Sequence, residues 1–302
     1  MGPTALLAQQ TLLTPGPRVR VSPFVKWAGG KGHLLRYLVP LVAPHLSNYY
    51  EPFLGGGALF FSIFNRGFPF TAFLSDTNDD LITTYKVVKE KSVELIQHLE
   101  SIQRQYLNST DKAAFYYRTR RSSPRDGIEL AVRFLFLNKT CYNGLYRVNS
   151  AGDFNVPFGR YDQPRIVNEA NILGVSRALN ETNARIASVD YMGATKTCRK
   201  GDFVYFDPPY DPASKTSAFT DYTPIGFDEQ DQMELANRFA QLAERGCNVL
   251  LSNSDTHLIR KLYGNYSVRS IDVSRPISCK GKNRKGFKEL IISSKPLDQK
   301  GV

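Results

Sequence analysis

The stretch "SNYYEPFLGGGALFFSIFNRGFPFTAFLSD", residues 47–76, carries the clearest indication of the fold. It opens with a short apolar run typical of a buried strand, which leads into three glycines at 55–57. The apolar run 58–66 is the expected helix, and a second strand-like run at 70–76 ends in Asp76. A strand, a crossover helix and another strand make the unit from which parallel sheets are built.

The same alternation of strands and helices returns after about residue 168. An amphipathic helix is predicted at 228–246 with Asp228 as its N-cap, because an aspartate side chain accepts hydrogen bonds from the first helical turn. Strands are expected at 184–191, 203–207 and 248–253, and in the closing runs "YSVRSIDV" and "FKELIISS". This order of elements predicts an α/β fold with a mostly parallel, doubly wound sheet.

A different pattern separates the two halves of this sheet. Long helical runs extend from Asp79 to about Leu137, and the stretch 142–161 then alternates around two turn signals, which predicts a β-hairpin. The expected divisions are a first part of the sheet domain at 1–78, with a loose N-terminal arm at 1–22, an inserted mainly helical domain at 79–167, and a second part of the sheet domain at 168–302.

Composition narrows the class of protein. With 302 residues, of which 42% are apolar, the chain can bury a substantial core. Its net charge of +11 favours an anionic partner such as nucleic acid or a membrane surface, although a charged surface also serves solubility alone. The four cysteines and four histidines show no CxxC or HExxH spacing, so we expect no structural metal and a reducing, cytoplasmic setting. No apolar run is long enough to span a membrane, and the N-terminus is a poor signal peptide.

Two features of 47–76 together indicate a nucleoside-containing cofactor. Glycines at a strand–helix turn let the backbone approach a ligand, and a helix N-terminus favours an anionic group. Asp76 follows the glycines by about twenty residues, a spacing that suits a carboxylate on a ribose diol. Each feature alone has a plainer explanation, the glycines as an ordinary turn and Asp76 as the N-cap of the helix beginning "NDDLITTY". No GKS or GKT sequence supports a Walker phosphate loop.

The run "FDPPY" at 206–210 carries the most specific chemistry. Asp207 offers a carboxylate, the Pro208 carbonyl a second acceptor and Tyr210 a flat ring face, while Pro208 and Pro209 hold these groups rigid. The arrangement suits an exocyclic amine, because acceptors on its two N–H groups draw the conjugated nitrogen towards tetrahedral geometry. An Asp-Pro turn that ends a strand would explain the prolines but not the tyrosine. A base in a duplex must flip out to reach such a site, which costs a few kcal/mol.

These motifs, in this order, resemble the DNA adenine-N6 methyltransferases of the alpha class, in which the recognition domain lies between the cofactor motif and the DPPY motif. The resemblance covers about Phe24 to Ser294 and rests on "FVKWAGGK", "EPFLGGG", "LSDTNDDL", "LNKTCYNGLYRVNSAGDFNVPFGRY", "FDPPY" and "RPISCKGKNRKGFKEL". It implies a Rossmann-like methyltransferase sheet with an inserted DNA-recognition domain, S-adenosylmethionine as the methyl donor and double-stranded DNA as the partner.

The resemblance also assigns roles to residues at the site. The expected cofactor contacts are Trp27, Lys31, Phe53, Gly55, Gly57, Asp76, Asp190, Tyr191 and Asp207. Phe53 and the glycines would hold the methionine end, Asp76 the ribose, and Asp190 with Tyr191 the cofactor adenine. The expected catalytic residues, which would hold the target adenine, are Asp207, Pro208, Pro209 and Tyr210.

The run "YNGLYRVN" resembles the DNA-reading element of members that modify GATC, which implies GATC, or a longer site with the same GAT start, as the target. Tyr142 would wedge between bases where the adenine leaves the stack, while Leu145 and Arg147 would read outer bases and Lys26 a base near the other end. Without the resemblance, Arg147 is more simply a solvated charge. Further expected DNA contacts are Asn143, Asn149, Pro157, Arg160, and the basic residues Lys280, Lys282, Arg284, Lys285 and Lys288.

Other interpretations stay open at this point. Related folds methylate cytosine N4, RNA bases or protein glutamine side chains, but those relatives more often carry Ser or Asn at the place of Asp207 and lack the "YNGLYRVN" run. A DNA-binding regulator without catalysis is a further alternative, against which the intact cofactor and DPPY motifs argue. The leading expectation is site-specific methyl transfer to adenine N6 in duplex DNA by a cytoplasmic, nucleoid-associated enzyme.

Overall fold

The computed structural model describes residues 20–42, 46–212, 227–273 and 287–297. Its strands are β1 (Asn48–Glu51), β2 (Thr71–Asp76), β3 (Arg185–Ser188), β4 (Phe203–Phe206), β5 (Asn248–Ser254), β6 (Ser267–Val273) and β7 (Phe287–Ser293). Its α-helices are α1 (Leu35–Leu38), α2 (Ala58–Phe64), α3 (Asp79–Glu90), α4 (Ser92–Asn108), α5 (Lys112–Arg121), α6 (Gly127–Thr140), α7 (Glu169–Glu181), α8 (Tyr191–Ala194), α9 (Glu229–Glu244) and α10 (His257–Leu262). Short 3-10 turns are η1 (Lys31–His33), η2 (Val39–Leu41) and η3 (Tyr142–Gly144).

Within these described residues, seven strands form one sheet in the order β3-β2-β1-β4-β5-β7-β6. The neighbours from β3 to β5 are parallel, and β7 is antiparallel to both β5 and β6. The predicted α/β class and mostly parallel sheet are therefore confirmed. At this edge β7 lies between β5 and β6 and runs antiparallel to both, so the sheet is mixed there.

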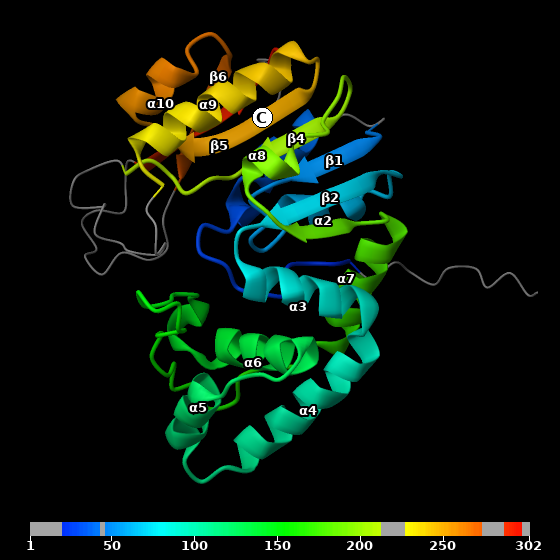
Figure 1. The fold of residues 1–302 in the computed structure, drawn as a ribbon, viewed down its shortest axis with the longest axis vertical. Helices are drawn as coiled ribbons and strands as arrows, with labels where there is room; N and C mark the ends of the chain where they lie inside the picture. The colour runs from blue at the N-terminus through cyan, green and yellow to red at the C-terminus, as the bar shows by residue number, and fades with distance from the viewer. Residues whose placement is uncertain (1–19, 43–45, 213–226, 274–286, 298–302) are drawn as a thin grey trace, which may run out of the picture.

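The central strand β4 is buried on both faces, since its successive side chains point to opposite faces and all four are buried. In β4, Phe203 and Tyr205 belong to the core shared with α2, α3 and α7, whereas Val204 and Phe206 belong to the core shared with α9 and α10. Figure 1 shows α9 and α10 over one face of the sheet, and α7 lies on the other side of it. This two-sided packing explains why the strand reads as a continuous apolar run.

The chain reverses its direction of winding between β1 and β4. From β1 it continues to β2 on one side, and from β4 it continues to β5 on the other, although β1 and β4 are themselves paired at Tyr49 with Phe203. The carboxyl ends of two such strands open a crevice, because the connections leave in opposite directions. The glycine turn after β1 and the "DPPY" run after β4 are thereby brought to the same edge.

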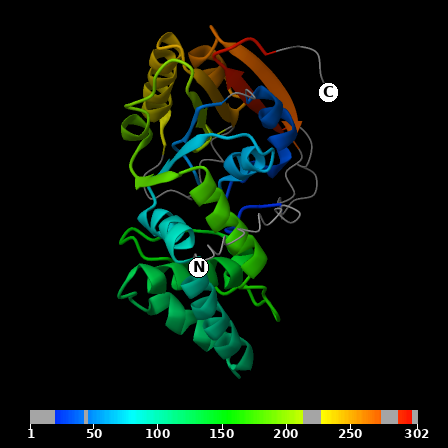
Figure 2. The same cartoon turned by 90° about the vertical axis from the view of Figure 1, so that its right-hand side faces the viewer.

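A group of helices, α4, α5 and α6, lies beyond the sheet at one end of the molecule in both views (Figures 1 and 2). Helix α3 packs against β2 and β3 and also against α6 and α7, so it connects the sheet to these helices. The side chain of Asn78 accepts a hydrogen bond from the Leu81 amide and caps α3, so the alternative that Asp76 is this N-cap is wrong. Asp228 caps α9 as predicted, with a reciprocal hydrogen bond from its own amide to Asp231.

Two other expectations need correction. The predicted β-hairpin at 142–161 has no regular strand: the chain folds back through η3 and a turn at Gly152, with only two isolated antiparallel bridges. A continuous ladder cannot form there, because Pro157 lacks an amide donor and Asn143 has a positive φ of 56°. The last residues of the expected loose arm are packed, since Val21 is buried and its amide donates to Asn65 Oδ1 at 2.9 Å, while 1–19 lie outside the described residues. None of the helices in the described ranges is long and apolar enough to cross a membrane.

Candidate active site

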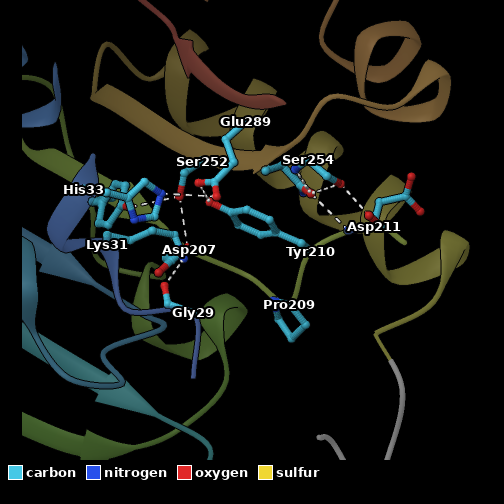
Figure 3. A network of polar contacts seen from close by, with 12 residues as sticks. Gly29, Lys31, His33, Asp207, Pro209, Tyr210, Asp211, Ser252, Ser254 and Glu289 are labelled. Atoms are coloured by element: carbon cyan, nitrogen blue, oxygen red, sulfur yellow. Dashed lines mark hydrogen bonds and ion pairs between the residues drawn. The ribbon is translucent and has the colours of Figure 1, made fainter. Parts of the chain in front are cut away.

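Asp207 directly follows β4 and is the centre of the site (Figure 3). Its Oδ1 lies 2.7 Å from the Lys31 ammonium and accepts a hydrogen bond from Ser252 Oγ at 3.0 Å. Lys31 belongs to η1, at the other end of the sequence, and also donates to the Gly29 carbonyl at 2.5 Å. Among the described residues nothing donates to Asp207 Oδ2, so this oxygen is available to an incoming N–H group.

The charge on Asp207 results from two opposing effects. Burial raises the pKa of Asp207, because a low-dielectric surrounding penalises the carboxylate. The Lys31 ammonium and the Ser252 hydroxyl lower the pKa of Asp207 and favour the ionised form. Burial is the larger effect and the pKa of Asp207 is raised overall, while Lys31 is the main group that favours its ionised form.

Tyr210 lies beside this pair with its ring under the Lys31 ammonium, which is 4.5 Å from the ring centroid. Its hydroxyl donates to Glu289 Oε2 at 3.1 Å, and Glu289 Oε1 lies 3.2 Å from His33 Nε2. Burial, the largest cause, and the nearby charge of Asp207 raise the pKa of Tyr210 well above its usual range, so the phenol stays a donor.

The prolines are held by side chains from the next layer. Gln232 of α9 donates to the Pro209 carbonyl at 3.0 Å, and Asn253 of β5 donates to Gln232 at 3.0 Å. Asn253 Oδ1 in turn accepts from the Asp211 amide at 3.1 Å. The Pro208 carbonyl has no donor within the part of the chain that the structure describes.

The glycine turn after β1 is shaped by Trp27 and Asp76. A Cβ added to Gly55, which has a φ of +46°, would lie 2.6 Å from Trp27 Cδ1, so no larger residue fits there. The Gly55 amide donates to Asp76 Oδ2 at 2.9 Å, and the Asn78 amide donates to Asp76 Oδ1 at 3.0 Å. Gly57 begins α2 as its N-cap. The structure thus brings together four of the residues expected at the cofactor, and burial raises the pKa of Asp76.

An aromatic cluster continues this edge of the sheet towards β3. Phe53 stacks on Tyr191 with the ring centroids 5.6 Å apart and the planes at 24°. Phe206 and Phe227 approach Phe53 edge-on. Asp190 caps α8, because its side chain accepts from the Gly193 amide at 2.7 Å, and remains exposed. Phe53 and Tyr191, far apart in the sequence, therefore lie side by side as one apolar surface.

Glu51 is a buried acid at the end of β1 that the sequence motifs did not single out. Its side chain accepts a hydrogen bond from the Tyr49 hydroxyl at 2.9 Å. Burial raises the pKa of Glu51 to about 8, although the hydrogen bond from Tyr49 opposes this rise. With Asp76 after β2 and Asp207 after β4, it places an acidic group at the carboxyl end of each of three neighbouring strands.

The segment around η3 is anchored to the N-terminal part of the chain by Asn138. Asn138 Oδ1 accepts from the Lys26 amide at 2.9 Å, and its Nδ2 donates to the Lys26 carbonyl at 2.8 Å and to the Gly144 carbonyl at 3.3 Å. A Cβ on Gly144 would lie 2.3 Å from Lys26 Cδ, so the close approach requires glycine. Lys26 therefore lies against the turn that contains Gly144. The neighbours of Gly144 in this turn are the exposed Tyr142 and Asn143 and the half-buried Leu145.

The other expected DNA contacts divide into exposed groups and groups with local roles. Arg147 is exposed and its Nε donates to Asn155 Oδ1 at 2.7 Å. Arg160 is exposed with a φ of +57°. Asn149 accepts from the amides of Ala151 and Asp153 and so shapes the turn. The exposed Pro157 accepts from the Tyr142 amide through its carbonyl. Lys288 is exposed on β7, while Lys280, Lys282, Arg284 and Lys285 lie outside the described residues.

The residues that sequence reasoning missed share one property. Each is a buried polar side chain within a helix or strand: Glu51 in β1, Asn138 in α6, Ser252 and Asn253 in β5, and Glu289 in β7. A buried polar group requires a partner, so such positions could have been marked as candidates. The partner of Glu51 is Tyr49, two residues earlier on the same strand, whereas the other four have partners from distant parts of the chain.

Comparisons with known proteins show which family this chain resembles. The family model for the D12 class N6 adenine-specific DNA methyltransferase matches residues 27–277. A Type II methyltransferase of Lactococcus lactis subsp. cremoris is 40% identical over 284 residues, which cover 92% of this chain and 96% of the relative. A Type II methyltransferase of Methanocaldococcus jannaschii is 40% identical over 288 residues, covering 91% and 99%. The DNA adenine methylase of Escherichia coli strain K12 is 37% identical over 280 residues, covering 90% and 95%.

The glycine turn, the acidic strand ends and the "DPPY" run thus occur together at one sheet edge, in a chain that matches both the family model and whole relatives. The chain belongs to the D12 class of N6 adenine-specific DNA methyltransferases.

Proposed function

We propose that this enzyme transfers a methyl group from S-adenosylmethionine to N6 of an adenine in double-stranded DNA, within GATC, after that adenine has flipped out of the helix. The observation that carries the proposal is the set of acceptors after β4. Asp207 Oδ2 and the Pro208 carbonyl have no donor among the described residues, and the Lys31 ammonium that pairs with Asp207 Oδ1 lies over the ring of Tyr210.

S-adenosylmethionine fits the donor set of this edge. The molecule carries a sulfonium and an ammonium, and acidic side chains end three neighbouring strands at Glu51, Asp76 and Asp207. Glu51, whose pKa burial raises to about 8, would ionise beside a cation, because a positive charge lowers the pKa of a carboxyl. The stacked rings of Phe53 and Tyr191 offer an apolar surface for the nucleoside end.

The bound donor would supply a methyl group on a positively charged sulfur, which N6 attacks in line with the breaking carbon–sulfur bond. The residues of this chain orient the amine. Asp207 Oδ2 and the Pro208 carbonyl would each accept one N–H of the amine, which localises its lone pair on nitrogen. The Tyr210 ring would stack on the adenine. The N6 proton leaves after transfer.

The segment 79–167 is the proposed recognition domain, between catalytic parts at 1–78 and 168–302. The proposal is supported by the position of η3. Lys26 of the first catalytic part lies against Gly144 of η3, and Tyr142 of the same turn therefore lies close to the catalytic domain. Tyr142 is 53% exposed, which suits a ring that enters a base stack. Arg147 is the proposed reader of a guanine.

The most direct test is methylome sequencing of DNA from a methylation-deficient host that expresses the chain. We expect N6-methyladenine at GATC with the intact protein, and none with Asp207→Ala, which should still fold. Full methylation by that variant would refute the role of Asp207. N4-methylcytosine in place of N6-methyladenine would support the cytosine alternative, which the family match disfavours.

A further inference from the structure

Glu289 is a buried acid on β7 that the proposed reaction does not use. It is 6% exposed and pairs with Ile271 of β6 on one side and Ser254 of β5 on the other, so its backbone is fixed within the sheet. Its two carboxylate oxygens contact Tyr210 and His33, at 3.1 Å and 3.2 Å. Among the described residues no lysine or arginine forms an ion pair with it.

Keeping an acid at this position is costly for stability. A buried carboxylate loses its hydration, and a phenol hydroxyl and an imidazole compensate for this less well than a guanidinium would. An apolar residue would pack between β5 and β6 without this penalty. The position therefore carries a requirement other than stability, and within the described ranges its carboxylate contacts Tyr210 and His33 at the site.

Tyr210 is a residue whose orientation needs fixing. It follows two prolines on a loop, and its ring rotates about two side-chain bonds unless its far end is held. The hydrogen bond from its hydroxyl to Glu289 holds that end, while the Lys31 ammonium lies over the ring, 4.5 Å from its centroid (Figure 3). His33 comes from the same η1 turn as Lys31 and holds the other oxygen of Glu289.

We propose that Glu289 is a positioning residue for methyl transfer: it fixes the plane of the Tyr210 ring, on which the target adenine stacks, through the phenol hydroxyl. The proposal rests on the proposed role of Tyr210 as the stacking ring. It adds Glu289 of β7 and His33 of η1, to which the sequence motifs assigned no role, to the machinery that orients the base.

The test is a double-mutant cycle on the single-turnover rate of methyl transfer, with S-adenosylmethionine and a GATC duplex both saturating. We expect Glu289→Ala and Tyr210→Phe each to slow transfer by about tenfold. The double variant should be no slower than the slower single variant, because both changes break the same contact. Glu289→Gln keeps an acceptor for the hydroxyl and should restore the rate to within about threefold of the unchanged protein.

Asp255→Ala is the matched control. Asp255 is an acid next to β5 that pairs with Arg260 at 2.6 Å and contacts neither Tyr210 nor Asp207, so its loss should leave the rate unchanged. Unfolding by denaturant identifies any variant that has lost its fold. A double variant about a hundredfold slower, the product of the two single effects, would overturn the proposal, and so would a fully active Glu289→Ala. Failure of the proposed function is separate: it would show as no N6-methyladenine from the unchanged protein.

Discussion

The replacement Lys31→Met tests whether Lys31 keeps Asp207 ionised. Met has nearly the length of Lys, so the change removes the ammonium with little change in volume. The ammonium lies 2.7 Å from Asp207 Oδ1, with side chains that are 7% and 18% exposed. At this distance Coulomb's law gives about 1.5 kcal/mol in a water-like dielectric and about 6 kcal/mol at an effective dielectric constant of about 20.

The lower of these values already corresponds to about tenfold in the protonation equilibrium. Because Lys31 lowers the pKa of Asp207 and burial raises it, loss of Lys31 moves that pKa upward. Fewer molecules then carry the carboxylate near neutral pH, and the carboxylate is the form that accepts from the amine. We therefore expect Lys31→Met to slow transfer at least tenfold near neutrality, with recovery as the pH rises.

The assay is the single-turnover rate at saturating S-adenosylmethionine and DNA, measured from about pH 6 to about pH 9. The acid limb of the profile should move to higher pH in Lys31→Met. Lys31→Arg, which retains the positive charge, is the control and should leave that limb near its original position. An equal fractional loss at every pH in Lys31→Met would refute the reasoning, since it would show that the ammonium does not govern the ionisation of Asp207.

Four further predictions follow from single contacts. Asn138→Ala removes hydrogen bonds to Lys26 and Gly144 and should lower the free energy of unfolding by about 2–3 kcal/mol in denaturant titrations; an unchanged value would contradict the anchoring role. Gly144→Ala should weaken binding to a GATC duplex, since its Cβ would meet Lys26, and equal affinity in a titration would count against that contact. Arg147→Ala should relax discrimination at one guanine by about 1–3 kcal/mol, measured as kcat/KM on substituted duplexes, while unchanged specificity would exclude it as the reader. Binding of S-adenosylmethionine near neutral pH should release a proton from Glu51, and calorimetry would detect this as a binding enthalpy that depends on the ionisation enthalpy of the buffer. Glu51→Gln should abolish this dependence. A buffer dependence that persists in Glu51→Gln would argue against Glu51 as the source of the proton.

Some features of the protein were determined by the sequence alone. Alternating apolar runs and helices predicted the doubly wound sheet, because a strand buried on both faces must be apolar throughout and its crossover must be helical. The glycine turn and the "DPPY" run each lie on consecutive residues, so their local conformation follows from glycine and proline themselves. The family likewise followed from the order of short motifs.

Tertiary structure decided which groups meet. Lys31 and Asp207 are far apart in the sequence, and their contact at 2.7 Å exists only because η1 lies against the carboxyl end of β4. The partner of Tyr210 is Glu289, which comes from a strand that runs antiparallel to β5 and whose place in the sheet no local pattern specifies. The segment 142–161 shows a limit of local patterns: its alternation predicted a hairpin, but the chain folds back with only two isolated bridges, and Gly144 in it is held by Asn138 and Lys26 from elsewhere. Local sequence fixes the conformation of a few neighbouring residues, whereas burial and pairing of charges depend on packing between distant segments.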